Sequence, residues 1–82
     1  MESTAEIQHA MINDGCDICF VYQDVRCGLA INAVNSTYTF TAWYGEHTKE
    51  YTSFDAAIND LFFGNQSLKT LVLHKRIKIG YC

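Results

Sequence analysis

The segment Thr37–Tyr44 constrains the fold most, because every residue in it is β-branched, aromatic or alanine. Its side chains alternate with a period of two, which is the spacing of a β-strand and not of a helix. One face is aromatic and apolar and the other carries threonines and a tryptophan, namely Tyr38, Phe40, Ala42 and Tyr44 against Thr39, Thr41 and Trp43. The pattern predicts a strand with one buried face.

Turn signals on both sides of this strand predict an antiparallel sheet. Gln23-Asp24 and Asn35-Ser36 fall between apolar runs and favour tight turns, and Gly45 begins a further turn over residues 45–48. The strands expected around these turns are residues 17–23, 25–32 and 37–44, with a short fourth strand over 49–52. The sheet is therefore expected to have three to four strands.

A helix is expected before the sheet. Ser3 and Glu6 have the spacing of a capping box, in which the serine accepts a backbone hydrogen bond and the glutamate reaches back. An apolar stripe at helical spacing follows, formed by Ile7, Ala10 and Met11. Gly15 supplies the left-handed residue that ends many helices. The predicted helix covers residues 4–13.

The C-terminal third of the chain contains two more helix starts. Ser53 is a candidate N-cap with Asp55 in the first turn, and Ser67 is a candidate cap for a short helix over 68–73. After Ser53 an apolar stripe is expected to run to a stop at Gly64, formed by Ile58, Leu61 and Phe62. Residues 76–81 alternate with period two and are a possible final strand.

These elements together predict a single α+β domain over residues 1–82: an N-terminal helix, an antiparallel sheet, and one or two short C-terminal helices. A chain of 82 residues has room for one core only. The hydrophobic content of 49% is typical of a globular protein and not of a disordered one. An acidic, polar start unlike a secretory signal and the lack of a long apolar run predict a cytoplasmic protein without a membrane span.

Charge is distributed unevenly along the chain. All nine acidic residues lie within the first 60 residues, where only Arg26 and Lys49 oppose them. The remainder carries no acid and four bases, Lys69, Lys75, Arg76 and Lys78. An acidic body argues against nucleic acid as the main partner, because phosphate binding needs clustered lysines and arginines.

The four cysteines are expected to be reduced thiols, because the chain starts without a secretory signal. Cys16 and Cys19 form a CxxC pair, which is compatible with half of a zinc site or with a redox pair. A zinc site would need a second close pair, and Cys27 and Cys82 are far apart in the chain. The pair also enters a strand, so its side chains should point to opposite faces. No metal or other cofactor is predicted.

No catalytic apparatus is recognisable. The three histidines, His9, His47 and His74, are scattered over a helix, a turn and the basic segment. There is no nucleophile elbow and no glycine-rich phosphate loop. The carboxylates after Tyr44 are typical of a solvated face. The chain is predicted not to be an enzyme.

Two candidate contact surfaces remain. The first is an acidic face made by Glu46, Glu50, Asp55 and Asp60, which fall on consecutive elements and could gather along one edge. The second is Trp43, which is either part of the core or, on the threonine face of its strand, a partly exposed interface anchor.

A resemblance bears on function. The segment over residues 38–71 contains Trp43-Tyr44-Gly45, Lys49-Glu50-Tyr51, Ser53-Phe54, Asp60-Leu61-Phe62-Phe63-Gly64 and Ser67-Leu68. In this pattern it resembles small uncharacterised proteins of phages and mobile elements of gut Gram-positive bacteria. Some proteins of that size and origin are anti-CRISPR inhibitors, which present an acidic, DNA-like face to a nuclease. The resemblance implies no particular functional residue.

The first hypothesis is therefore a non-enzymatic protein-binding module of mobile-element origin. In its sharper form the chain inhibits a host nucleic-acid-handling enzyme, with the four acids as phosphate mimics. The alternative is a nucleic-acid-binding accessory protein that uses the four C-terminal bases beside an exposed aromatic residue. A third, zinc-stabilised module would depend on the cysteines.

Overall fold

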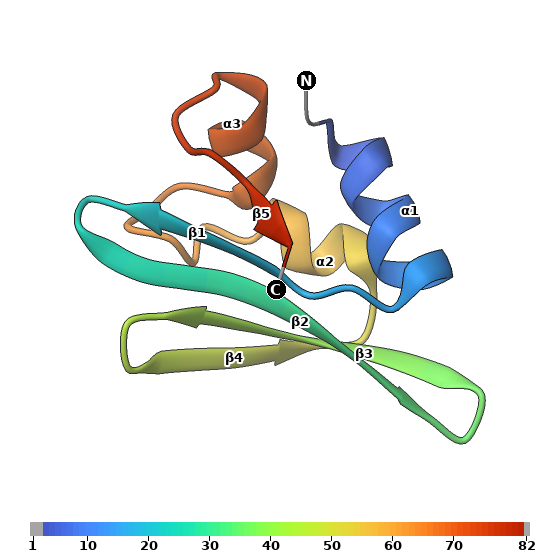
Figure 1. Ribbon diagram of the computed structural model, residues 1–82. Coiled ribbons are helices and arrows are strands. Elements are labelled where there is room, and N and C mark those ends of the chain that lie inside the picture. The colour runs from blue at the N-terminus through green and yellow to red at the C-terminus, as the bar shows by residue number, and fades with distance from the viewer. Residues whose placement is uncertain (1–2, 82) are drawn as a thin grey trace.

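The computed structural model describes residues 3–81 and has an α+β fold (Figure 1). The elements follow in the order α1 (Thr4–Asp14), β1 (Ile18–Tyr22), β2 (Val25–Val34), β3 (Thr37–Tyr44), β4 (His47–Tyr51), α2 (Phe54–Asn59), α3 (Leu68–Leu73) and β5 (Gly80–Tyr81). The predicted fold class is confirmed, with the short β5 added as a fifth strand.

The sheet is antiparallel throughout, with the strand order β4-β3-β2-β1-β5. Two of its hairpins turn where the sequence predicts. Gln23 and Asp24 join β1 to β2, Asn35 and Ser36 join β2 to β3, and all four have positive φ. Two residues in this conformation match the twist of the strands that they connect.

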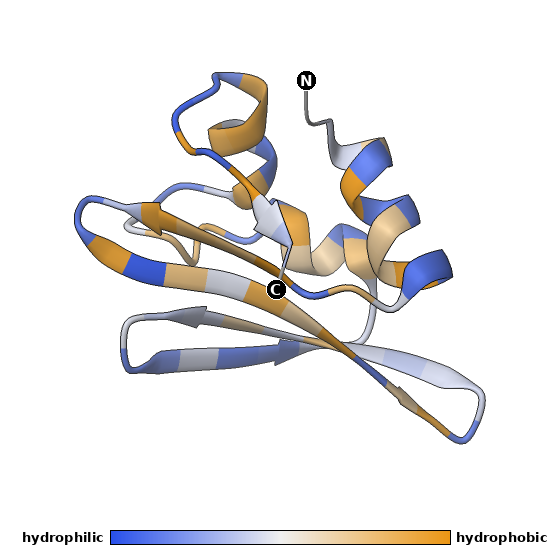
Figure 2. Cartoon of the chain, viewed as in Figure 1, coloured by the Kyte–Doolittle hydropathy of each residue, from blue (hydrophilic) through white to orange (hydrophobic). Residues whose placement is uncertain are grey.

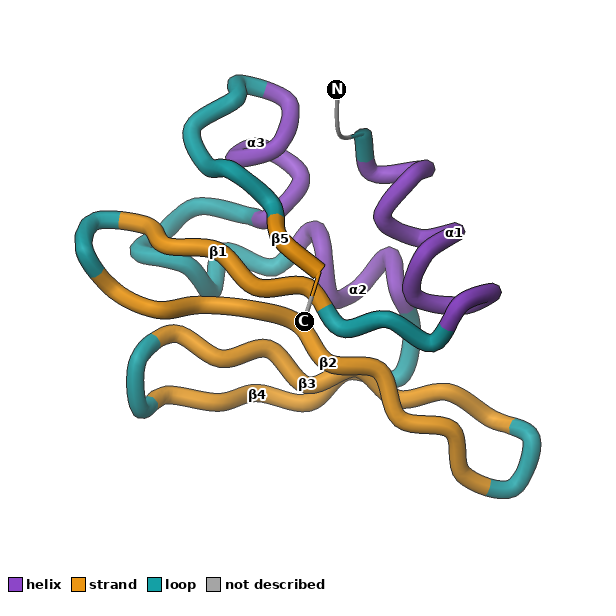
Figure 3. The backbone as a smooth tube through the Cα atoms, viewed as in Figure 1, coloured by secondary structure: helices purple, strands orange, loops and turns teal. Residues whose placement is uncertain are grey.

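All three helices lie on the same side of the sheet, as Figure 3 shows. Helix α1 begins at the predicted cap, where the Ser3 hydroxyl oxygen accepts a hydrogen bond from the Glu6 N–H, and it ends at a left-handed Gly15. Ser53 and Ser67 cap α2 and α3 in the same way. The residues that join helices and sheet form one apolar cluster, which includes Ile7, Met11, Ile18, Leu29, Phe63 and Leu71. Figure 2 colours the ribbon by hydropathy and shows apolar segments in both the helices and the strands.

The hairpin of β2 and β3 extends past its neighbours. β1 pairs with β2 only as far as Leu29, and β4 pairs with β3 only from Phe40 onward. Beyond β1, the Asp17 carboxylate accepts a hydrogen bond from the Ile31 N–H at 3.0 Å. This side chain satisfies a backbone donor for which β1 supplies no partner.

The region after Ser53 differs from the expectation. Helix α2 ends at Asn59, and Asp60 already has an extended backbone, so the predicted stop at Gly64 is wrong. Leu61 is 64% exposed and is not part of a buried stripe. Phe63 takes the core position, where its ring lies 5.2 Å from that of Phe20. The final strand is also shorter than predicted, because only Gly80 and Tyr81 pair with β1.

The early end of α2 coincides with a polar cluster. The Asp60 carboxylate accepts hydrogen bonds from Lys49 Nζ at 2.8 Å and from the Tyr51 hydroxyl at 2.6 Å. Both donors lie on β4, on the face that the helices cover. An extended Asp60 therefore connects the chain after α2 to the edge strand β4.

Within residues 3–81, no helix is long and apolar enough to cross a membrane.

Candidate functional site

In the described part of the chain, no helix covers the side of the sheet opposite α1, α2 and α3. Each strand places alternate side chains there, and the register brings them into one surface. We call this surface the open face. It consists of Cys19 and Val21 on β1, Arg26, Gly28, Ala30, Asn32 and Val34 on β2, Thr37, Thr39, Thr41 and Trp43 on β3, and Thr48 and Glu50 on β4. No helix in the described part of the chain packs on it (Figure 1).

Trp43 lies on this face, as predicted for the threonine side of its strand. The pairing aligns one residue from each strand into a row: Thr48, Trp43, Gly28, Cys19 and Gly80. Gly28 has no side chain, and the indole of Trp43 takes the space above it. A Cβ at Gly28 would approach Cζ2 and Cη2 of the indole to well under 3.0 Å. The half-buried indole is thus held by the backbone of the neighbouring strand.

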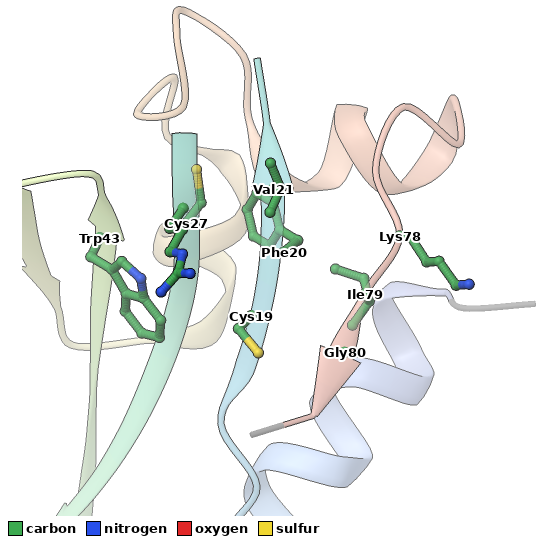
Figure 4. Close-up of a pocket in the computed structure, with 9 residues that line it drawn as sticks. Cys19, Phe20, Val21, Cys27, Trp43, Lys78, Ile79 and Gly80 are labelled. Atoms are coloured by element: carbon green, nitrogen blue, oxygen red, sulfur yellow. The ribbon is translucent and has the colours of Figure 1, made fainter. Parts of the chain in front are cut away.

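A groove of about 700 Å³ lies beside the indole (Figure 4). Gly80, which carries no side chain, and the disulfide-bonded Cys19 form its floor. Phe20 and Cys27 reach the groove through their backbones, since their side chains are buried on the opposite face. The remaining lining residues are Val21, Arg26, Trp43, Lys78 and Ile79. Val21 is 59% exposed at this site.

The charges beside the groove are both positive. Arg26 is the strand partner of Val21, and Lys78 lies just before β5. In Figure 4 the Lys78 side chain extends outward from the rim. No aspartate or glutamate of residues 3–81 lines the groove, and neither base forms an ion pair with another described residue. The site is a shallow apolar groove with two cations at its margin.

The four predicted acidic residues lie on different elements in or next to the edge strand β4. Glu46 is in the turn between β3 and β4, and Glu50 pairs with Thr41 on the open face. Asp55 belongs to the first turn of α2, on the side of the helices. Asp60 lies on the helix-covered side of β4, where Lys49 and Tyr51 hold it. Their hydrogen bonds lower the pKa of the Asp60 carboxyl, and burial with this contact raises the pKa of the Tyr51 hydroxyl.

The four bases of the C-terminal segment are also divided. Lys69 is on α3, and Lys75 and Arg76 follow the end of that helix. Only Lys78 lines the groove beside Trp43. The three histidines lie on separate elements: His9 on α1, His47 on β4, and His74 at the end of α3.

The prediction of reduced cysteines is wrong for Cys19, which is disulfide-bonded. Cys16 and Cys27 are free thiols, and burial raises the pKa of Cys27. Cys82 lies outside the described residues. Within these, no three histidine, cysteine or acidic side chains are close enough together to hold a metal ion.

Comparisons with protein-family models, with curated proteins and with solved structures give no match. The site is therefore interpreted from its own geometry. Sequence reasoning singled out Trp43 but missed Gly28, Arg26 and the groove. A glycine inside an otherwise apolar strand was the available signal, since it often marks the close approach of another group.

Proposed function

We propose that this chain is a non-enzymatic protein-binding module that contacts its partner through the open face, with Trp43 as the anchor. The observation that carries the proposal is the indole held over Gly28 on a sheet face that no described helix covers. Tryptophan is enriched among residues that dominate binding energy, particularly when its conformation is fixed before binding.

The surroundings of Trp43 support a protein partner. Exposed Val21 and the groove provide apolar area next to the indole, while threonines and Arg26 surround it. An apolar centre with a polar margin is the usual composition of a protein interface. The resemblance to proteins of phages and mobile elements makes a host protein the expected partner.

For the inhibitor hypothesis we propose the open face, in place of the four acids, as the contact surface. Asp60 is neutralised by Lys49, and Asp55 lies on the side of the helices. Only Glu50 of the four acids belongs to the open face. We therefore centre the proposed contact on Trp43 and keep inhibition of a nucleic-acid-handling enzyme as a possible consequence of binding.

The test compares two substitutions of the same type. Val21 and Val34 both lie on the open face and are exposed to similar degrees, 59% and 55%, but Val34 lies at its far end, roughly 20 Å further along β2 than Gly28. Immobilised wild-type, Val21→Glu and Val34→Glu proteins would be used to capture proteins from a nuclease-treated host lysate, with quantification by mass spectrometry. Circular dichroism would confirm that both variants fold.

We expect Val21→Glu to lose a protein that wild type and Val34→Glu both retain. Equal capture by all three proteins would contradict a contact at the Trp43 end of the open face. Proteins captured from an untreated lysate but lost from the nuclease-treated one would instead favour the nucleic-acid-binding alternative, in which Lys78 acts beside Trp43.

A further inference from the structure

The groove beside Trp43 has space for one apolar side chain. Among the described residues, a Cβ at Gly80 would lie 3.5 Å from the Cys19 carbonyl oxygen and 3.9 Å from its Sγ, which are ordinary contact distances. The groove of about 700 Å³ therefore extends over Gly80, while the indole of Trp43 forms a wall over Gly28. An aliphatic or aromatic side chain placed on this floor would contact the indole and Val21.

The charge around the groove selects the chemistry of its occupant. The protein has a formal net charge of −3, but its groove is lined by Arg26 and Lys78 and by no described acid. Neither cation is paired with a carboxylate among residues 3–81. A basic margin on an acidic protein favours an anionic ligand at this place and disfavours a basic one.

The neighbouring strand edge favours an extended occupant. β5 pairs only with Ile18 and Cys19 of β1. The outer edge of Phe20, Val21 and Tyr22 has no strand partner in the described part of the chain. An extended peptide can pair with such an edge through its backbone while alternate side chains enter a groove.

We propose that the groove receives an acidic, extended segment of the partner protein, with one apolar side chain against Trp43 and carboxylates at Arg26 and Lys78. This inference rests on the proposed function and specifies the partner's chemistry. Two cations and an indole whose inner face is covered by Gly28 favour an acidic peptide over a nucleic acid, which is bound through several phosphates and stacked bases.

The test uses Trp43 itself as the reporter, because it is the only tryptophan of the chain. The probe is a short synthetic peptide with a central leucine flanked by glutamates. The first control is the same peptide with glutamines in place of the glutamates. The second is a random-sequence single-stranded oligonucleotide. Each is titrated into the full chain at low salt while the Trp43 emission is followed.

Two charge-reversed variants separate the groove from general charge. Arg26→Glu with Lys78→Glu removes both cations of the groove, and Arg76→Glu with Lys69→Glu makes the same change in charge elsewhere. All four residues are exposed, which favours folding of both variants. We expect the glutamate peptide to bind saturably, about tenfold more weakly to the groove variant, and within about twofold of wild type to the control variant.

Equal binding of the glutamine peptide, or equal weakening by both variants, would overturn the acidic occupant. Tighter binding of the oligonucleotide would overturn the choice of a peptide. No change in Trp43 emission on addition of the glutamate peptide would also overturn this inference. The Val21→Glu capture experiment is independent of the peptide, so the proposed function could still stand in each case.

Discussion

The indole of Trp43 occupies the space that a side chain at position 28 would fill, so that the tryptophan on β3 and Gly28 on β2 are matched across the sheet. This pairing places the ring against the neighbouring strand, on the face that no described helix covers. It leaves one end of the ring next to the groove that Cys19 and Gly80 floor.

The first prediction follows from that match. Gly28→Ala places a Cβ into the indole and close to the Ile18 carbonyl oxygen, so the ring and a strand must both shift. We expect the free energy of unfolding to fall by about 2 kcal/mol, the typical cost of overpacking. Gly80→Ala is the matched control, because its Cβ has ordinary contacts, and it should change stability by less than about 0.5 kcal/mol. Urea denaturation measures both; similar losses would contradict the account.

The second prediction concerns two leucines. Leu71 is 1% exposed in the core, whereas Leu61 is 64% exposed after α2. Leu71→Ala should cost about 2–5 kcal/mol, because it removes buried methyl groups and leaves a cavity. Leu61→Ala should stay within about 0.5 kcal/mol of wild type. Chemical denaturation measures the free energy of unfolding of both variants. A large loss of stability in Leu61→Ala would contradict the structure and favour the buried helix face that the sequence predicts.

The sequence predicts an element well when the interactions that set it are between residues close together in the chain. Thr37–Tyr44 and the caps at Ser3, Ser53 and Ser67 are set by neighbouring residues, and the structure confirms them. Leu61 has the spacing of a helix face, yet the helix stops before it. There Asp60 bonds to Lys49 and Tyr51, which are distant enough in sequence that local propensity does not reveal the contact.

The candidate site was predictable in part for the same reason. Alternation placed Trp43 on the threonine face, and the register of β3 agrees. The groove depends on how β1, β2 and β5 align. This alignment brings Arg26 and Lys78, which are far apart in the chain, to the same groove. The acidic face stays a prediction, in which strand alternation places Glu50 and the Asp60 contact on opposite sides of β4.

The third prediction is a pH dependence at Asp60. Hydrogen bonds from Lys49 and Tyr51 hold the pKa of this carboxyl below its ordinary value in the folded state. The folded state is therefore favoured by the ionised carboxylate above the unfolded pKa, and this contribution is lost as the pH falls through the lower, folded pKa. Wild type should lose more stability than Asp60→Asn when the pH is lowered from about 6 to about 3.

The control for that experiment is Glu50→Gln, which removes a carboxylate without a bonding partner among the described residues. At neutral pH, Asp60→Asn should cost about 1 kcal/mol, since the ion pair is partly exposed but the Tyr51 hydroxyl is not. Thermal unfolding at several pH values provides the comparison. If the stability of wild type and of Asp60→Asn changed in parallel with pH, the Asp60 contact would contribute nothing to the pH dependence of stability.

The central claim is that the open face around Trp43 is the surface that the partner covers. The most direct measurement is quenching of the single tryptophan by acrylamide, a neutral molecule, in the free protein and in complex with a captured partner lacking tryptophan fluorescence. The account predicts that the partner lowers the quenching constant of Trp43 severalfold. It also predicts that Val21→Glu, which weakens the complex, restores quenching at the same concentrations. A quenching constant that stays unchanged while the partner is demonstrably bound would contradict the claim.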